Sequence, residues 1–496
     1  MNEVSSPSFG AINYIVIFAY LVATAVIGML FSARNKSTDD YFRGGQRVPA
    51  IVAGLSIFAC LLSSLTFMSV PALAYNGDWS YSLSSLSAYL IIAPVVIFFY
   101  LPLCRKLDIT TAYEYLERRF NYSIRVFGSI SFMLLQFFRI AIILYLPALA
   151  FSTIAGIPME ISVLVVGVLC LILTIFGGMS AVVWTEALQA VVLFGAALTA
   201  ILAIVSRVDG GVATVFNIAL EQKKFFGQVP VFDGTRAGLA VILVGGFFIN
   251  LVGYTTQQDM VQRYMTTKDL RSAAHSIWIN AVVGIIGVVI FFLLGTMIYV
   301  FYHTYPEQLS SGVANDAIVP YFIHNELPVG IAGLVVAGIF AAAQSSISGS
   351  LNSLATTWIV DIHRRINPEL SDKGQLVLAK KIVAVVGMAA IGVAYGLKFL
   401  NVVSLFDVML TVGGLVMSSL GGVFCLGMLT RRGNSFGAVV GVIVSVSVLT
   451  YLWIFAKLSF WFYSPIGFLI AFGVGWIASL LRSQGIRCAS QEGGQS

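Results

Sequence analysis

The sequence predicts an all-α integral membrane protein, on the evidence of its composition and the length of its apolar segments. Of its 496 residues, 58% are hydrophobic and only 10% are charged, and the mean hydropathy is +0.93. Soluble proteins carry about 25% charged residues. The apolar segments run to about 20 residues or more, long enough for a helix to cross a hydrocarbon core of about 30 Å. Backbone groups in lipid must be hydrogen-bonded internally, and the short alternating segments of membrane strands are missing, so these segments are predicted helices.

Thirteen segments are predicted to span the membrane. They are residues 11–33, 49–75, 81–103, 126–154, 160–178, 181–206, 237–256, 273–302, 328–359, 382–400, 403–430, 436–456 and 463–481. The predicted parts of this single membrane domain (1–481) are an extra first helix (11–33), repeat one (49–206), repeat two (237–430) and two extra helices (436–481), followed by a tail (482–496). Ten spans in two groups of five therefore form the predicted core.

The lysines and arginines between the spans predict the orientation of the chain. Most of the 28 lie in alternate loops and in the tail. The loops on the other side hold only Arg207, Lys223, Lys224, Arg236, Lys398 and Lys457. Because basic residues accumulate in cytoplasmic loops, the N-terminus is predicted outside and the tail in the cytoplasm. We interpret the net charge of +6 as this orientation signal in a lipid bilayer, and we expect no nucleic-acid partner.

The predicted span at residues 328–359 carries many hydroxyl groups. Steps of three or four residues place two sets on adjacent helical faces: Ser345, Ser348, Asn352 and Thr356 on one, and Ser346, Ser350, Ser353 and Thr357 on the other. One interpretation is close packing, with hydroxyls bonded to carbonyls one turn back. The other is a cation site, because a hard cation such as Na⁺ binds uncharged or carboxylate oxygens. The number of hydroxyls favours the cation site.

The predicted span at residues 49–75 is a candidate for a broken helix, because it contains Pro71 and the pair Ser63 and Ser64. Breaks of this kind lie near the bilayer midplane of transporters, where freed carbonyls bind ions and substrates. A simple proline kink is the alternative.

A second candidate break lies at residues 244–259, where Gly245, Gly246 and Gly253 surround Asn250. The two candidate breaks occupy matching positions in the two predicted five-span halves. This pairing is typical of an inverted-repeat transporter.

Two charged side chains lie within or beside predicted spans. Arg139 has apolar neighbours on both sides, and an unpaired arginine inside the bilayer costs at least about 2.5 kcal/mol. Its predicted partner is an anionic substrate, which a guanidinium can bind through two parallel hydrogen bonds. A structural ion pair, or a side chain that reaches the membrane surface, is the alternative. Glu186, near the start of the span at 181–206, is open to either an ion pair or a bound cation.

Six segments resemble the sodium:solute symporter family. They are DDYFRGGQRVPA (39–50), SIFACLLSSLTFMSVPALAY (56–75), GGMSAVVWTEALQ (177–189), QQDMVQRY (257–264), AAAQSSISGSLNS (341–353) and LGMLTRRGNSFGAVVG (426–441). The resemblance covers nearly the whole chain. It is closest to bacterial sodium/sialic acid symporters, through FRGG, LSSLTFMS, the tract around Arg139 and AAAQSSIS. It implies a leucine-transporter-type fold of ten core helices plus three, in a bacterial inner membrane.

The resemblance also implies a main sodium site between the spans at 49–75 and 328–359. Carried over residue by residue, its ligands are the carbonyls of Ala59, Leu62 and Ala342 and the hydroxyls of Ser345 and Ser346. Some members have a second sodium site. The matching positions here are Glu186, Ser345, Ser348 and Gly349, with glutamate where the family has aspartate and glycine where it has a hydroxyl.

The sialic acid members hold the substrate carboxylate with an arginine that matches Arg139. The rest of their sugar pocket falls on Ser63, Thr66 and Tyr81. Two pocket positions differ, because Leu61 stands where a threonine is expected and Ser85 where a glutamine is expected. These differences bear on the choice of substrate.

The function that the resemblance implies is sodium-coupled symport. The expected substrate is a small carboxylate-bearing solute, with sialic acid (N-acetylneuraminate) favoured, imported by alternating access with Na⁺ as the co-transported ion and no organic cofactor. The alternative is another organic acid, a sugar, an amino acid or a vitamin. An enzyme is not expected, because no paired metal-ligand spacing, HExxH motif or nucleotide-binding glycine loop occurs around His275, His303, His324 and His363.

Overall fold

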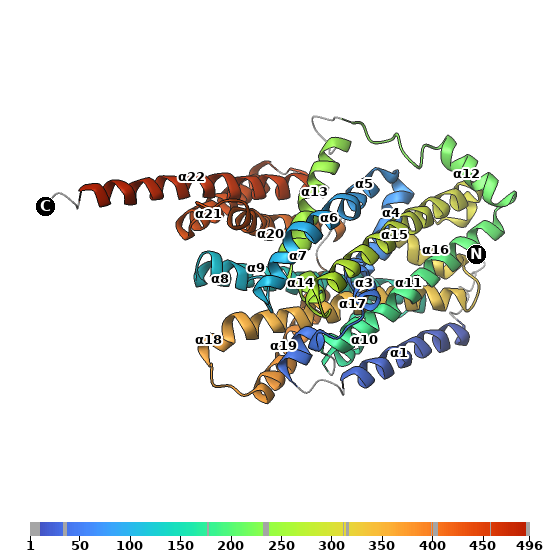
Figure 1. The fold of residues 1–496 in the computed structure, drawn as a ribbon. Helices are drawn as coiled ribbons and strands as arrows, with labels where there is room; N and C mark the ends of the chain where they lie inside the picture. Colours follow the sequence, from blue (N-terminus) through green and yellow to red (C-terminus); the bar gives the residue numbers. More distant parts are fainter. Residues whose placement is uncertain are drawn as a thin grey trace.

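The computed structural model describes residues 10–32, 37–175, 178–231, 238–310, 312–313, 317–397, 399, 405–456 and 458–492. Every regular element in these ranges is helical, which confirms the all-α prediction. Most of the long helices lie side by side, and the C-terminal helix projects beyond them (Figure 1).

The long helices are α1 (Ala11–Ser32), α9 (Tyr122–Ala155), α10 (Met159–Ile175), α11 (Met179–Arg207), α13 (Leu239–Thr256), α15 (Leu270–Thr304), α17 (Ile331–Thr357), α19 (Asp372–Leu397), α20 (Leu405–Leu429), α21 (Ser435–Tyr451) and α22 (Tyr463–Glu492). The shorter helices are α2 (Thr38–Arg43), α3 (Ala50–Leu61), α4 (Ser64–Asn76), α8 (Glu114–Arg119), α12 (Gly211–Glu221), α14 (Gln258–Met265), α16 (Ile318–Glu326) and α18 (Arg364–Ile366). A composite helix, Trp79–Leu107, joins α5 (Ser82–Ser87), α6 (Ala93–Val95) and α7 (Leu101–Leu107) through π-helical turns at Ala88–Ile92 and Val96–Tyr100.

Eleven helices among the described residues are long and apolar enough to cross a membrane. A twelfth span is counted when a helix pair bent by 109°, Thr38–Gln46 with Ala50–Leu61, is included. Two of the thirteen predicted spans are therefore not single long helices. The span at 49–75 is divided between α3 and α4, and the span at 160–178 corresponds to α10, which has 17 residues.

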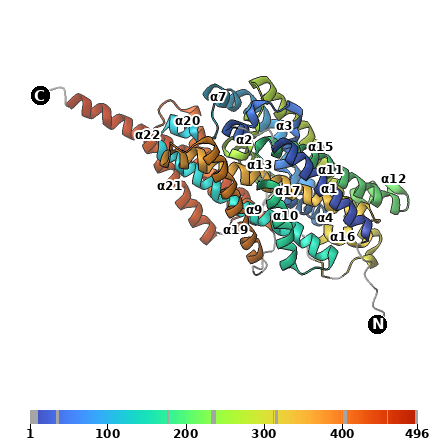
Figure 2. The same cartoon turned by 90° about the horizontal axis from the view of Figure 1, so that it is seen from below.

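The polar helix α17 lies at the centre of the molecule (Figure 2). Apart from Ile331 and Leu334, every one of its residues is buried, and it packs against α1, α3, α4, α9 and α11. Its many glycine, alanine and serine residues allow this, since small side chains let neighbouring helices approach closely. The two hydroxyl-bearing faces predicted for this span therefore face protein.

The first and last helices lie at the periphery of this arrangement. The helix α1 packs along α11 and α17, whereas α20, α21 and α22 pack against one another. Figure 1 shows α1 and the group formed by α20 to α22 at opposite edges of the molecule. The helices that surround α17 are thus mostly those between α3 and α15.

The predicted break in the first core span is confirmed, and it falls at Leu62 and Ser63. Leu62 has φ −94° and ψ 87°, outside the helical region. Ser63 then begins α4 as its N-cap, with a side chain that accepts a hydrogen bond from the Thr66 amide, as serine commonly does at this position. Pro71 lies inside α4 and does not break it. The serine pair, rather than the proline, marks the break.

The predicted break in the second repeat lies within residues 244–259, but not at the glycines around Asn250. The helix α13 runs without interruption through Gly245, Gly246 and Gly253, and the break lies at Gln257, with φ −82° and ψ 121°. The first two glycines serve close packing. A Cβ on Gly246 would lie 2.2 Å from Ser84 Oγ, and one on Gly245 would lie 2.5 Å from the Trp461 carbonyl oxygen.

We expect Gly295→Ala to destabilise the contact between α15 and α4. An added Cβ would lie 2.1 Å from the Pro71 carbonyl oxygen, so one backbone would have to move away from another. Overpacking of this kind costs about 1–3 kcal/mol, and the midpoint of thermal unfolding in detergent should fall by several degrees. Gly392→Ala is the matched control, because a Cβ there would meet nothing within 4 Å. An unchanged midpoint for Gly295→Ala would contradict the packing.

Candidate ion and substrate site

The break between α3 and α4 gathers backbone carbonyls beside α17. Because α3 ends at Leu61, carbonyls after Phe58 in its last turn lack the partner that a continuing helix would provide. Ser345 Oγ lies 3.0 Å from the carbonyl oxygen of Ala59 and 3.0 Å from that of Ala342. All three residues are fully buried. The structure therefore brings together three of the five predicted ligands of the main sodium site as neutral oxygens, which suit a hard cation.

The other two predicted ligands lie next to this cluster. Ser346 Oγ donates to the carbonyl of Cys60 at 3.4 Å, so it contacts the residue after Ala59. Leu62 is the C-cap residue of α3 and lies in the break itself. The site is assembled from two elements that are far apart in the sequence. The residues present fit a sodium ion, because the donor set is built from carbonyl and hydroxyl oxygens.

The hydroxyls of α17 divide into two groups. Ser348, Ser353, Thr356 and Thr357 donate to carbonyls three or four residues back in their own helix, as the packing interpretation predicted. Ser345 and Ser346 reach the carbonyls of α3, Ser345 in addition to its contact with Ala342, and Ser350 donates to Gln136 Oε1 on α9 at 2.9 Å. Only part of the cluster therefore bears on ion binding.

Arg139, predicted to bind the substrate carboxylate, has protein partners in this structure. Its guanidinium donates to Asp259 Oδ2 at 3.0 Å and to the carbonyl oxygen of Cys60 at 3.0 Å. The arginine is 9% exposed and the aspartate is fully buried. The alternative considered from the sequence, a structural ion pair, is therefore present.

A cavity of about 220 Å³ lies beside the break. Thr66, Tyr81 and Ser85 line it, as does Leu61, whereas Ser63 and Arg139 are not among its lining residues. The lining residues include no charged side chain among the described residues, and several are aromatic. The Arg139 guanidinium donates to the carbonyl of Cys60, the residue before the cavity residue Leu61. Three of the five predicted substrate residues thus share one cavity with the break.

Among the cavity residues that were not predicted as substrate contacts, Asn250 carries a side-chain amide. Asn250 lines the cavity, and its side-chain amide donates to the carbonyl oxygens of Ser84 and Gly246 at 3.0 and 2.8 Å. The signal in the sequence is a single amide inside an apolar span, and the prediction uses it only as part of a candidate helix break.

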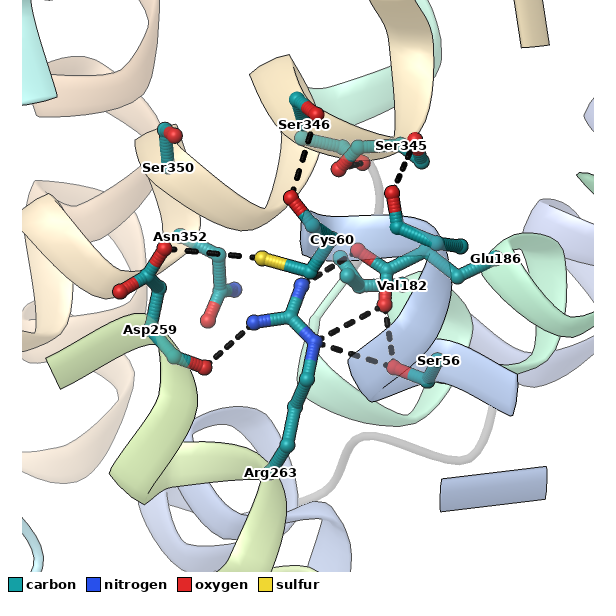
Figure 3. Close-up of polar contacts among 12 residues, drawn as sticks. Ser56, Cys60, Val182, Glu186, Asp259, Arg263, Ser345, Ser346, Ser350 and Asn352 are labelled. Carbon is teal, nitrogen blue, oxygen red and sulfur yellow. Dashed lines mark hydrogen bonds and ion pairs between the residues drawn. The ribbon is translucent and has the colours of Figure 1, made fainter. Parts of the chain in front are cut away.

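Glu186 is held by a second buried arginine. Its Oε1 accepts a hydrogen bond from Arg263 Nη2, and its Oε2 accepts one from Arg263 Nε at 3.1 Å and another from Ser56 Oγ (Figure 3). Arg263 Nη1 also donates to the backbone carbonyl of Asp259. Glu186 and Gly349 do lie together, as the second sodium site requires, but a guanidinium lies beside both. The role of Arg263 was not predicted, although its segment, QQDMVQRY, was among those that carried the resemblance.

The fold and the site define a class of protein. Two broken helices, a buried cluster of carbonyl and hydroxyl oxygens at one break and an adjoining cavity are typical of secondary transporters built from inverted repeats. The family model for the sodium:solute symporter family matches residues 41–445. The chain belongs to this family, and the fold is of the leucine-transporter type.

Individual relatives are similar over nearly their whole length. The sodium/sialic acid symporter SiaT of Proteus mirabilis is 40% identical, over 92% of this chain and 93% of its own. The sodium/sialic acid symporter NanT of Aliivibrio fischeri is 38% identical, over 95% and 94%. The solved structure of a Na⁺-coupled sialic acid symporter in a substrate-bound outward-open state matches with a TM-score of 0.89 at 39% identity, covering 96% of this chain and 98% of that one.

Proposed function

We propose that this protein is a sodium-coupled symporter that imports a carboxylate-bearing solute, with N-acetylneuraminate as the favoured substrate. The observation that carries the proposal is the contact of Ser345 Oγ with the carbonyls of Ala59 and Ala342 at 3.0 Å. It provides buried neutral oxygens for Na⁺ at a helix break. The two sodium/sialic acid symporters that resemble the chain over more than nine tenths of its length support the choice of substrate.

Sodium binding at this cluster would join the broken span to α17. The ion would draw together the last turn of α3 and the turn of α17 that carries Ser345, and so stabilise one arrangement of the two helices. A ligand shifts a conformational equilibrium only by its difference in affinity for the two states. A substrate that prefers the same arrangement would therefore bind more tightly when sodium is present, and the effect is reciprocal.

The substrate carboxylate would be recognised by Arg139. In this structure the guanidinium is paired with Asp259, so the substrate has to share the arginine with that carboxylate or displace it. A guanidinium offers five donors, of which one contacts Asp259 and one the Cys60 carbonyl. The remaining donors are the ones available to an incoming carboxylate. Thr66, Tyr81, Ser85 and Asn250 would contact the rest of the solute.

The proposed setting is a bacterial inner membrane with the N-terminus outside and the C-terminus in the cytoplasm. The start of α1 and the helix α12 lie at one end of the molecule, and α8 and α18 lie at the other (Figure 1). The helix α8 ends in a pair of arginines and α18 begins with a pair, as expected for the cytoplasmic side. Apolar side chains on the outer helices support contact with lipid, among them Phe18, Leu30, Phe98, Phe99 and Phe455, each exposed by 60% or more.

Uptake into proteoliposomes tests the proposed function. Labelled N-acetylneuraminate should accumulate when an inward sodium gradient is imposed, and the accumulation should disappear when potassium replaces sodium. A panel of other organic acids, sugars, amino acids and vitamins should give weaker uptake. Protein shown to be folded that accumulates another member of the panel instead would reassign the substrate, and Leu61 and Ser85 would be the first residues to examine.

A further inference from the structure

Glu186 is a buried carboxylate that requires a positive partner. It is 0% exposed, and a charged group inside a membrane protein is stable only when paired. Some members of the family have a sodium ion near this position. The positive partner that Glu186 has in this structure therefore bears on whether the chain has that second site.

The partner in this structure is the guanidinium of Arg263. Both oxygens of Glu186 are engaged, Oε1 by Arg263 Nη2 and Oε2 by Arg263 Nε at 3.1 Å. Such two-point pairing fixes the guanidinium in the plane of the carboxylate. Ser56 Oγ donates to Oε2 as well, and Arg263 itself is 1% exposed. The carboxylate oxygens face arginine and serine hydrogens, and their arrangement does not suit a metal ion.

Gly349 makes room for this guanidinium. A Cβ at this position would lie 2.3 Å from Arg263 Nη2 and 3.1 Å from Glu186 Oε1. A side chain bearing a hydroxyl, as the second sodium site requires, would occupy the space that the arginine fills. Ser348, the other expected ligand, donates to the carbonyl of Ser345 within its own helix at 3.2 Å. The residues present do not fit a second sodium ion.

The charges of this region already balance. Glu186 is paired with Arg263, and Asp259 is paired with Arg139. Figure 3 shows Arg263 between Glu186 and Asp259. Two carboxylates and two guanidinium groups therefore lie close together in the interior. A sodium ion added beside Glu186 would have to compete with the guanidinium of Arg263 for the same carboxylate oxygens.

We propose that the guanidinium of Arg263 is a permanent cation that takes the place of a second sodium ion, so that this chain binds and couples one sodium per cycle. The inference rests on the proposed function for its transport consequence, but the count of bound ions does not depend on which solute is carried. A guanidinium is always protonated and is tethered to the chain. It can stabilise Glu186 through the cycle but cannot carry charge across the membrane.

The ion count determines how transport responds to membrane voltage. One sodium entering with one monoanion moves no net charge, so the accumulation ratio follows the sodium gradient alone. With two sodium ions, one net positive charge would enter in each cycle. A potential of 100 mV is worth about 2.3 kcal/mol per charge, which corresponds to a factor of about 50 in accumulation. The two stoichiometries therefore differ by a large and measurable amount.

Direct counting of bound ²²Na⁺ on purified protein, in the absence of substrate, tests the inference. We expect one ion per chain in the wild type and one in the double variant Glu186→Gln/Arg263→Met, which removes both charges together. Arg263→Met alone should bind two, because the freed carboxylate then attracts a sodium ion. Two ions in the wild type and one in the double variant would overturn the proposal. The wild type and the double variant decide the question even if the single variant does not fold.

A voltage experiment supplies the transport readout. In proteoliposomes with a fixed sodium gradient, an inside-negative potential of 100 mV set by potassium and valinomycin should leave N-acetylneuraminate accumulation unchanged. A rise of about 50-fold would overturn the one-sodium inference. Absence of any uptake alongside one bound sodium would instead contradict the proposed substrate and leave the ion count standing.

Discussion

Replacing Ser345 with alanine is expected to weaken sodium binding and substrate binding together. The hydroxyl contacts the carbonyls of both Ala59 and Ala342, so its removal takes one ligand from the proposed ion and a hydroxyl donor from two buried carbonyls. Losing a buried polar partner costs about 1–3 kcal/mol, or about 5- to 150-fold in sodium affinity. Because ligand coupling is reciprocal, the apparent substrate affinity at a fixed sodium concentration should fall as well.

Sodium titrations of binding and of uptake would measure this effect. Ser353→Ala is the matched control, since Ser353 is equally buried on α17 but donates only to the carbonyl of Ser350 in the same helix. The control should leave the sodium affinity close to that of the wild type. A loss of sodium affinity in Ser345→Ala without any change in substrate affinity would contradict coupling through this site.

Replacing Arg139 with methionine is expected to abolish uptake and to destabilise the protein. The change leaves the Asp259 carboxylate buried without its ion-pair partner, and breaking a buried pair in this way costs about 3–5 kcal/mol. The loss of uptake in this variant would therefore combine a folding effect with a binding effect. Thermal unfolding in detergent and uptake should be measured on the same preparation.

The double variant Arg139→Met/Asp259→Asn separates these two effects. It removes both charges, so it should regain most of the lost stability, since neutral replacements of a buried ion pair are often tolerated. Substrate binding should remain absent, because no guanidinium is left to hold the carboxylate. If the double variant binds N-acetylneuraminate as tightly as the wild type, the carboxylate is held elsewhere, and the role assigned to Arg139 is wrong.

The helices were predictable from the sequence because hydropathy alone determines which segments can cross a membrane. The position of the second break, at Gln257, was not predictable from the glycines. Gly245 and Gly246 were interpreted as places where a helix unwinds, but glycine serves two purposes in membrane helices, flexibility and close packing. Which of the two purposes a glycine serves depends on the segment that packs against it. Ser84 and Trp461, which pack on these glycines, are distant in the sequence.

The candidate site was predictable in part. The hydroxyls of α17 suggested a cation site, and Ser345 and Ser346 do face the break. Whether a hydroxyl donates a hydrogen bond within its own helix depends on which segment packs against it. Helical periodicity does not predict that segment. The ion-pair partners of the buried charged residues were not predictable from the sequence. Arg139 lies 120 residues from Asp259, and Glu186 lies 77 residues from Arg263, so each pairing exists only once the tertiary fold has formed.

The ion pairs Arg139–Asp259 and Glu186–Arg263 also bear on how the chain assembles in the membrane. Arg139 and Glu186 belong to the predicted first repeat, whereas Asp259 and Arg263 belong to the second. During synthesis the first two charges enter the bilayer before their partners exist, at a cost of about 2.5–3.5 kcal/mol for each. When α14 packs against the first half, Asp259 and Arg263 pair with both charges, and the cost of leaving them unpaired is removed. The first half thus carries two unpaired buried charges until the second half docks and pairs both of them.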